Sequence, residues 1–121
     1  MKYGRKITGG KYHKRSKKKK HSLSGIENKV KLRETKKKMI RLRGGTKKSI
    51  ILSTNIATIT NPKNHKTSTA KIKTVVQTPS NNFLARQNIL VKSAIIDTDL
   101  GKARITNRPS RDGNVQAVLL E

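Results

Sequence analysis

The stretch that decides the fold reads AKIKTVVQ and occupies residues 70–77. Ala70 and Ile72 alternate with lysines, which is the two-residue period of a β-strand with one apolar face and one basic face. It is the longest strand signal in the chain, and Pro79 marks its end because proline lacks the N–H that a neighbouring strand would bind. A strand of this kind needs partner strands, which must come from the rest of the chain.

Short runs rich in β-branched residues continue on both sides of this stretch. They predict further strands at residues 40–43, 48–53, 56–60, 89–91, 94–97, 103–106 and 115–120. Turn residues separate them at Gly44-Gly45, Asn61-Pro62, Leu100-Gly101 and Asp112-Gly113. Ser80 or Asn81 could cap a helix of one or two turns. We therefore expect an all-β fold, a small and mostly antiparallel β-barrel (or a sandwich) of six or seven short strands with one short helix.

Charge and apolar residues divide the chain in opposite ways. The 121 residues carry 30 Lys and Arg against 6 Asp and Glu, a formal net charge of +24, of which residues 1–48 hold +18. Only 7 of the 27 Ile, Leu and Val residues lie in that first part. A segment with so much charge and so little to bury cannot offset its conformational entropy. We therefore expect a basic N-terminal extension over residues 1–36, disordered when alone, and a β-barrel domain over residues 37–121.

Several function classes lack support in the residues. The chain has no Cys, no apolar run of the ~18 residues that a membrane span needs, and no secretion signal, so we expect a soluble intracellular protein. Asp97 and Asp99 could in principle form a metal-binding carboxylate pair, but turn-forming residues are the favoured interpretation. We expect no enzyme activity, no metal, no cofactor, no small-molecule substrate, no membrane partner and no homo-oligomer.

The excess of cations points to a nucleic-acid partner. Aromatic residues are only Tyr3, Tyr12 and Phe83, too few for a sheet that stacks single-stranded bases, and Phe83 is expected to pack the short helix onto the core. No recognition helix for DNA is predicted. The pattern favours a large folded RNA, contacted mainly at its phosphates. A general nucleic-acid chaperone or a chromatin-type protein is the alternative, because it would carry the same charge.

Ordered motifs along the chain resemble one known family. These are Gly9-Gly10-Lys11-Tyr12-His13, the turn Arg41-Leu42-Arg43-Gly44-Gly45, and the C-terminal run from Arg86 that includes GKARITNRP and ends in AVLLE. Together they resemble the S-eight-e family of small-subunit ribosomal proteins of archaea and eukaryotes, over essentially the whole chain. The short length is similar to the archaeal form.

The resemblance implies a structural constituent of the small (30S) ribosomal subunit, cytoplasmic and at work in translation. Its partners would be small-subunit ribosomal RNA and other small-subunit ribosomal proteins. In the extension we expect RNA contacts from Lys2, Tyr3, Arg5, Lys6, Lys11, Tyr12, His13, Lys14, Arg15, Lys17, Lys18, Lys19 and Lys20. On the barrel rim we expect contacts from Arg41, Arg43, Lys47, Lys48, Arg104, Arg108 and Arg111.

Overall fold

The computed structural model describes residues 4–13, 17–23, 25 and 27–120. Within them lie η1 (Lys20–Ser22), β1 (Val30–Lys31), β2 (Lys36–Arg41), β3 (Lys47–Ser53), β4 (Ile56–Thr60), β5 (Thr67–Gln77), α1 (Asn82–Arg86), β6 (Ile89–Leu90), β7 (Ile95–Thr98), β8 (Gly101–Ile105) and β9 (Gln116–Leu119). Five strands close a barrel and four form a second sheet, which confirms the all-β barrel expected from the sequence. The described residues contain nine strands rather than six or seven: β2 to β9 each overlap a run named from the sequence, and β1, with two residues, is too short to leave a period in the sequence.

The barrel is closed by one parallel pairing. Its strand order is β4-β5-β7-β8-β9, and β9 returns to pair with β4 in parallel, while the other four pairings are antiparallel. The ladder between β5 and β7 shifts register between Ile72 and Thr74 and again between Val75 and Gln77. Such irregularities bend a strand, and bending is what lets a short sheet curl into a closed barrel.

The barrel interior holds the apolar core. Alternate residues of each strand point inward, so Ile59 of β4, Ile72 of β5 and Ile96 of β7 are buried while their neighbours face outward. The wholly buried Ala103 of β8 provides a small residue between these branched side chains. Burial of this kind stabilises by roughly 25 cal/mol for each Å² of apolar surface removed from water.

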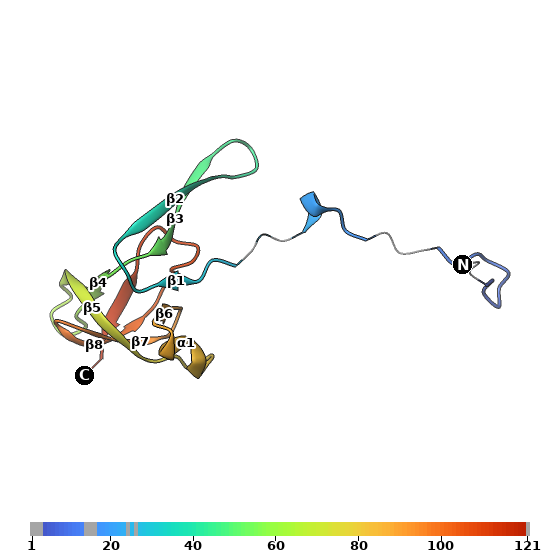
Figure 1. Cartoon of the computed structure of the whole chain (residues 1–121). Helices are drawn as coiled ribbons and strands as arrows, with labels where there is room; N and C mark the ends of the chain where they lie inside the picture. Colours follow the sequence, from blue (N-terminus) through green and yellow to red (C-terminus); the bar gives the residue numbers. More distant parts are fainter. Residues whose placement is uncertain (1–3, 14–16, 24, 26, 121) are drawn as a thin grey trace.

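The second sheet has the order β2-β3-β1-β6 and carries a long hairpin. β2 and β3 are antiparallel, and Figure 1 shows their hairpin projecting from the body. In its loop, Leu42 N–H donates to the Thr46 carbonyl at 2.7 Å, and Gly45 N–H donates to the Leu42 carbonyl at 3.2 Å. Gly44 and Gly45 both have positive φ angles, +86° and +87°, which residues with a Cβ rarely adopt. The expected Gly-Gly turn is therefore present.

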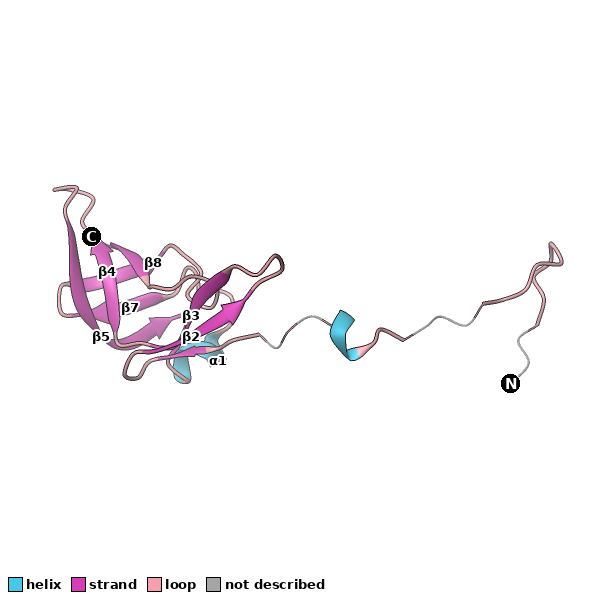
Figure 2. Cartoon of the chain, turned by 90° about the horizontal axis from the view of Figure 1, so that it is seen from above, coloured by secondary structure: helices cyan, strands magenta, loops and turns pink. Residues whose placement is uncertain are grey.

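Strand β1 ties the N-terminal extension to the body. Val30 is wholly buried and pairs with Leu90 of β6, and Lys31 pairs in parallel with Ser53 of β3. The chain N-terminal to β1 extends away from the body in both views (Figures 1 and 2). All the described residues between 4 and 25 are exposed.

Helix α1 packs against β5 and β6 through Ala85 rather than through the ring of Phe83. The Asn81 side chain accepts a hydrogen bond from Phe83 N–H at 2.9 Å, so the expected cap is present. Ala85 packs against the core, whereas the Phe83 ring is 68% exposed, so the expectation that Phe83 packs onto the core is wrong. In so short a helix one face meets the body, and Phe83 lies off that face, with the Arg86 guanidinium 5.8 Å from its ring centroid.

Candidate nucleic-acid interface

The β2–β3 hairpin presents the densest positive charge on the folded body. Seven exposed basic residues, the hairpin cations, lie on its strands and loop: Lys36, Lys37, Lys38, Arg41, Arg43, Lys47 and Lys48. Residues 35–96 contain no Asp or Glu, so the exposed Glu34, two residues before Lys36, is the one carboxylate near the hairpin cations along the chain. The structure thus brings together four residues expected from the sequence and adds Lys36, Lys37 and Lys38, which extend β2 on the N-terminal side of the expected strand at residues 40–43.

The register of the hairpin sets like charges against one another. Arg41 lies directly opposite Lys47, while Ile40 lies opposite Lys48 on the other face. Like charges directly opposite in an antiparallel pair are destabilising. Among the residues that the structure describes, none forms an ion pair with a hairpin cation. An anionic partner would relieve this repulsion, and phosphate groups along RNA have suitable charge.

The loop 106–114 is stiffened by internal hydrogen bonds. Asn107 Nδ2 donates to the Asn114 carbonyl at 2.8 Å, and the Asp112 carboxylate accepts from Arg108 N–H at 3.0 Å. Arg111 N–H donates to the Arg108 carbonyl at 3.0 Å. The Asp112 carboxylate thus accepts a hydrogen bond from the backbone of its own loop. The Arg108 and Arg111 side chains are exposed.

This loop lies directly against the hairpin. A Cβ placed on Gly113 would come within 2.8 Å of Ser49 Oγ on β3, closer than atoms in van der Waals contact approach. Any residue with a Cβ at this position would force the Ser49 side chain to move, because two segments far apart in the sequence approach closely here. The contact joins the loop that carries the exposed Arg108 and Arg111 to the hairpin, as the sequence could not show, while Arg111 itself lines a pocket with Glu27 and Asn28.

Arg104 lies on the barrel wall instead. It is exposed on β8, opposite Ile95 of β7 and Val118 of β9, and shares its outward face with Lys102. Of the seven rim residues expected from the sequence, the structure therefore gathers six at the hairpin and its neighbouring loop and places Arg104 on a strand of the barrel.

The described part of the extension contains one small hairpin of its own. Arg5 and Lys11 form an antiparallel bridge, Lys6 N–H donates to the Gly10 carbonyl at 2.8 Å, and Lys6 Nζ lies 5.8 Å from the Tyr12 ring centroid. His13 and the run Lys17–Lys20 are exposed. The expected contacts Lys2, Tyr3, Lys14 and Arg15 lie outside the described residues. In the described part of the extension, the cations and the Tyr12 ring are thus exposed to solvent.

The acidic pair considered from the sequence lies on the barrel. Asp97 belongs to β7 and lies opposite Lys102 of β8, and the Asp99 carboxylate is 3.4 Å from Lys73 Nζ. Both partners of that ion pair are more than half exposed, so it contributes little to stability. Within residues 4–13, 17–23, 25 and 27–120, no group of three or more His, Cys, Asp or Glu side chains could hold a metal ion. In the same residues no helix is long and apolar enough to span a membrane.

Comparison with known proteins gives one family. The sequence model of the family described as Ribosomal protein S8e matches residues 1–120. The similarity therefore includes the basic extension as well as the barrel, and it agrees with the resemblance seen in the ordered motifs.

Individual relatives are similar along nearly their whole length. The small ribosomal subunit protein eS8 of Methanosarcina barkeri is 41% identical over 117 residues, which cover 97% of this chain and 94% of the relative. The protein of the same name from Haloquadratum walsbyi is 42% identical, covering 97% and 92%. That from Pyrobaculum aerophilum is 40% identical over 119 residues, covering 97% and 91%. These relatives are archaeal, as the length of the chain suggested.

Proposed function

This chain belongs to the ribosomal protein S8e family, and from that premise we propose that it is a structural constituent of the small ribosomal subunit that binds folded ribosomal RNA. The observation that carries the proposal is the set of hairpin cations, which are exposed and form no ion pair among the described residues. Phosphate contacts of this kind position a protein on RNA without reading much sequence. The protein would act by neutralising charge and holding RNA helices together rather than by catalysis.

The extension and the barrel have separate parts in this proposal. Residues 1–36 would be the RNA-binding extension, whose part up to residue 25 would be disordered without RNA while β1 (Val30–Lys31) is anchored on β3 and β6. Residues 37–121 would be the barrel domain that docks on RNA helices. The exposure of every described residue between 4 and 25 supports this division, because those residues bury almost nothing against the body. The extension would gain order on entering crevices between RNA helices, with other small-subunit proteins as neighbours in the cytoplasmic ribosome.

Deletion of residues 1–20 tests the role of the extension. We expect weaker binding to small-subunit ribosomal RNA in a filter-binding titration, because the deletion removes Arg5, Lys6, Lys11 and the run Lys17–Lys20. The far-UV circular dichroism of the barrel should stay the same, since the deleted residues bury nothing in it. Unchanged RNA affinity at physiological salt would contradict the proposed role.

A charge-matched pair of variants tests the hairpin. Arg41→Gln with Lys47→Gln removes two charges from the hairpin, and Lys71→Gln with Lys92→Gln removes two from elsewhere on the body, all four residues being exposed. If each hairpin cation neutralises one phosphate, the slope of log K against log salt should fall by about 0.7–0.9 for each phosphate that is no longer neutralised. Equal slopes for the two double variants would show that only net charge matters, as expected of a general nucleic-acid chaperone.

Sucrose-gradient fractionation separates the proposed function from that alternative. A ribosomal constituent should sediment with small subunits in stoichiometric amount after a moderate salt wash. A chaperone or chromatin-type protein that exchanges among sites should be removed by the same wash, because its binding is mainly electrostatic.

A further inference from the structure

A cavity of about 170 Å³ lies between the β2–β3 hairpin, β4 and the end of loop 106–114. Its apolar walls are Ile51 of β3, Ile56 of β4 and Val115. Ile56 is 43% exposed although it is large and apolar, so part of this wall is open to solvent. The volume suits one flat ring system, since it is several times the roughly 30 Å³ that a water molecule occupies in the liquid. Gly113 approaches Ser49 closely, so loop 106–114 and β3 are in contact beside the cavity.

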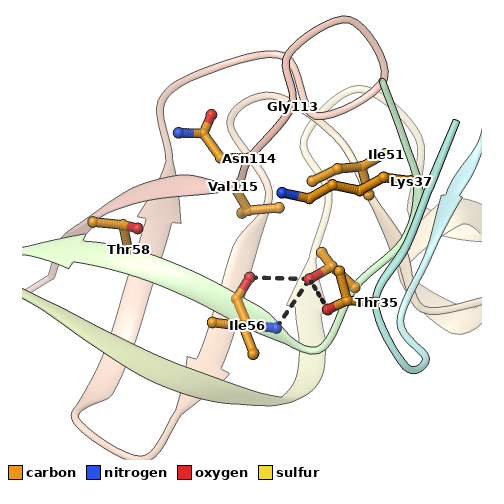
Figure 3. A pocket seen from close by; sticks show the side chains of 9 residues that line it. Thr35, Lys37, Ile51, Ile56, Thr58, Gly113, Asn114 and Val115 are labelled. Carbon is orange, nitrogen blue, oxygen red and sulfur yellow. Dashed lines mark hydrogen bonds between the residues drawn. The ribbon is translucent and has the colours of Figure 1, made fainter. Parts of the chain in front are cut away.

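Three polar side chains in the lining have hydrogen-bonding capacity to spare. Lys37 extends from β2 towards Val115 on the opposite side, as Figure 3 shows. Within the described part of the chain, no residue bonds to Lys37 Nζ, to Thr58 Oγ1 or to the amide nitrogen of Asn114. The cavity thus offers an ammonium group, a hydroxyl and an amide donor.

The hydroxyl of Thr35 is a fourth polar group in the lining. Thr54 Oγ1 accepts from Ile56 N–H at 3.2 Å and donates to the Ile56 carbonyl at 3.3 Å, as drawn in Figure 3. The 3.1 Å bond between Thr35 Oγ1 and Thr54 Oγ1 can be donated by either hydroxyl, and in both cases Thr35 Oγ1 keeps at least one unused lone pair. The lining therefore combines donors and an acceptor around an apolar wall, as the edge and faces of a nucleobase require.

We propose that this cavity binds a single unpaired nucleobase turned out of an RNA helix, with the phosphate of that nucleotide at Lys37. The proposal rests on the proposed function, because it assumes an RNA partner, and it adds a site for one particular kind of nucleotide. The exposed Ile56 contacts a face of the base above the buried Ile51 and Val115, and Thr58 and Asn114 bind its edge. The hairpin cations hold the RNA backbone on either side of the extruded residue.

Charge around the cavity identifies RNA as the occupant. Lys37 lies in the lining, and its neighbours Lys36 and Lys38 on β2 add positive charge to the hairpin against the single carboxylate of Glu34 beside Thr35. The nearest carboxylate in loop 106–114, Asp112, already accepts a backbone hydrogen bond from Arg108. A neutral ring in the cavity with an anion at its mouth matches this arrangement, and a nucleotide provides both in one residue.

The test uses the full chain and five RNA hairpins with the same stem. One is fully paired, and the other four each carry a single bulged A, G, C or U. Affinities are measured by fluorescence anisotropy at physiological salt. We expect at least one bulged hairpin to bind on the order of tenfold more tightly than the paired one, the lower part of the range observed for single-base contacts.

Two tryptophan substitutions, one in the lining and one outside it, test whether the preference for a bulged base depends on the cavity. Thr58→Trp places a large ring in the lining, at an exposed strand position where aromatic residues are well tolerated. Thr74→Trp is the matched control, exposed on β5 and outside the lining, and neither change alters net charge. Thr58→Trp should abolish the preference for the bulge and leave affinity for the paired hairpin unchanged, while Thr74→Trp should keep the preference.

A milder variant covers the case in which Thr58→Trp disturbs the fold. Thr58→Val removes only the hydroxyl and should reduce the preference by a smaller factor. Equal binding of bulged and paired hairpins, or a preference that survives both substitutions at Thr58, would overturn the cavity proposal while leaving phosphate binding by the hairpin intact. Failure to bind any of the RNAs, or small-subunit ribosomal RNA, would instead refute the proposed function.

Discussion

The contact between loop 106–114 and the hairpin can be tested by adding one methyl group. In Gly113→Ala the new Cβ would lie 2.8 Å from Ser49 Oγ and 3.5 Å from the Ser49 carbonyl oxygen. The φ angle of Gly113 is outside the left-handed region, so alanine meets no backbone strain there. The cost of the substitution therefore comes from the approach to Ser49, and chiefly from its hydroxyl oxygen.

The size of the effect depends on what residue 49 carries. With serine present, the Ser49 side chain must turn away from the new methyl group, which should cost about 0.5–1.5 kcal/mol. Against this, alanine restricts the unfolded chain and contributes about 0.4–1 kcal/mol to stability. In the Ser49→Ala background the obstructing oxygen is gone, so Gly113→Ala should be neutral or slightly stabilising. The two substitutions should thus show a coupling free energy of about 0.5–1.5 kcal/mol, as residues in contact can.

Urea unfolding of the four proteins in the double-mutant cycle measures this coupling. Far-UV circular dichroism is the appropriate signal, because the chain has no Trp and both Tyr residues lie in the extension. Ser49→Ala alone should have little effect, since no described residue forms a hydrogen bond with the Ser49 hydroxyl. If Gly113→Ala changed stability equally in both backgrounds, the loop would not lie against β3 as described, and the cavity would lose one of its walls.

Other predictions concern stability and use the same urea unfolding experiment. Thr78 is wholly buried and its hydroxyl has no hydrogen-bond partner among the described residues, so Thr78→Val should stabilise by about 1 kcal/mol. The equally buried Thr98 donates to the Gly101 carbonyl at 2.7 Å, so Thr98→Val should destabilise by about 1–3 kcal/mol, and effects of the same sign would refute the reasoning. Val30→Ala should cost about 2 kcal/mol because its side chain is wholly buried, whereas the exposed Leu23→Ala should have almost no effect. Asn81→Ala should cost about 1 kcal/mol through loss of the α1 cap, and faster amide exchange at the start of that helix should accompany it.

Local patterns in the sequence were enough to find the strands of the barrel. The expected strand at residues 56–60 has the bounds of β4, and the stretch 70–77 lies within β5. These predictions succeeded because the two-residue period reflects which side chains face the core, and each strand carries that pattern by itself. The hairpin charges were equally visible, since Arg41, Arg43, Lys47 and Lys48 flank a recognisable turn.

Features that depend on distant residues were not visible in the same way. β1 has only two residues, and its place in the second sheet depends on pairing with β3 and β6. The exposure of Phe83 depends on which face of α1 meets the body. Neither fact can be predicted from a local period in the sequence, because both depend on packing between segments that are distant along the chain.

The sequence by itself determined the all-β class and the uneven distribution of charge and apolar residues, from which we predict a basic extension and an anionic partner, because composition and short-range periodicity carry that information. Only the tertiary structure decided that β9 closes the barrel against β4 and that Gly113 lies against Ser49. These non-local contacts create the cavity beside Lys37 and place the Arg108 and Arg111 loop next to the hairpin. The physical reason is that such a site exists only where segments far apart in the chain are packed together, and closure of the barrel is what packs them.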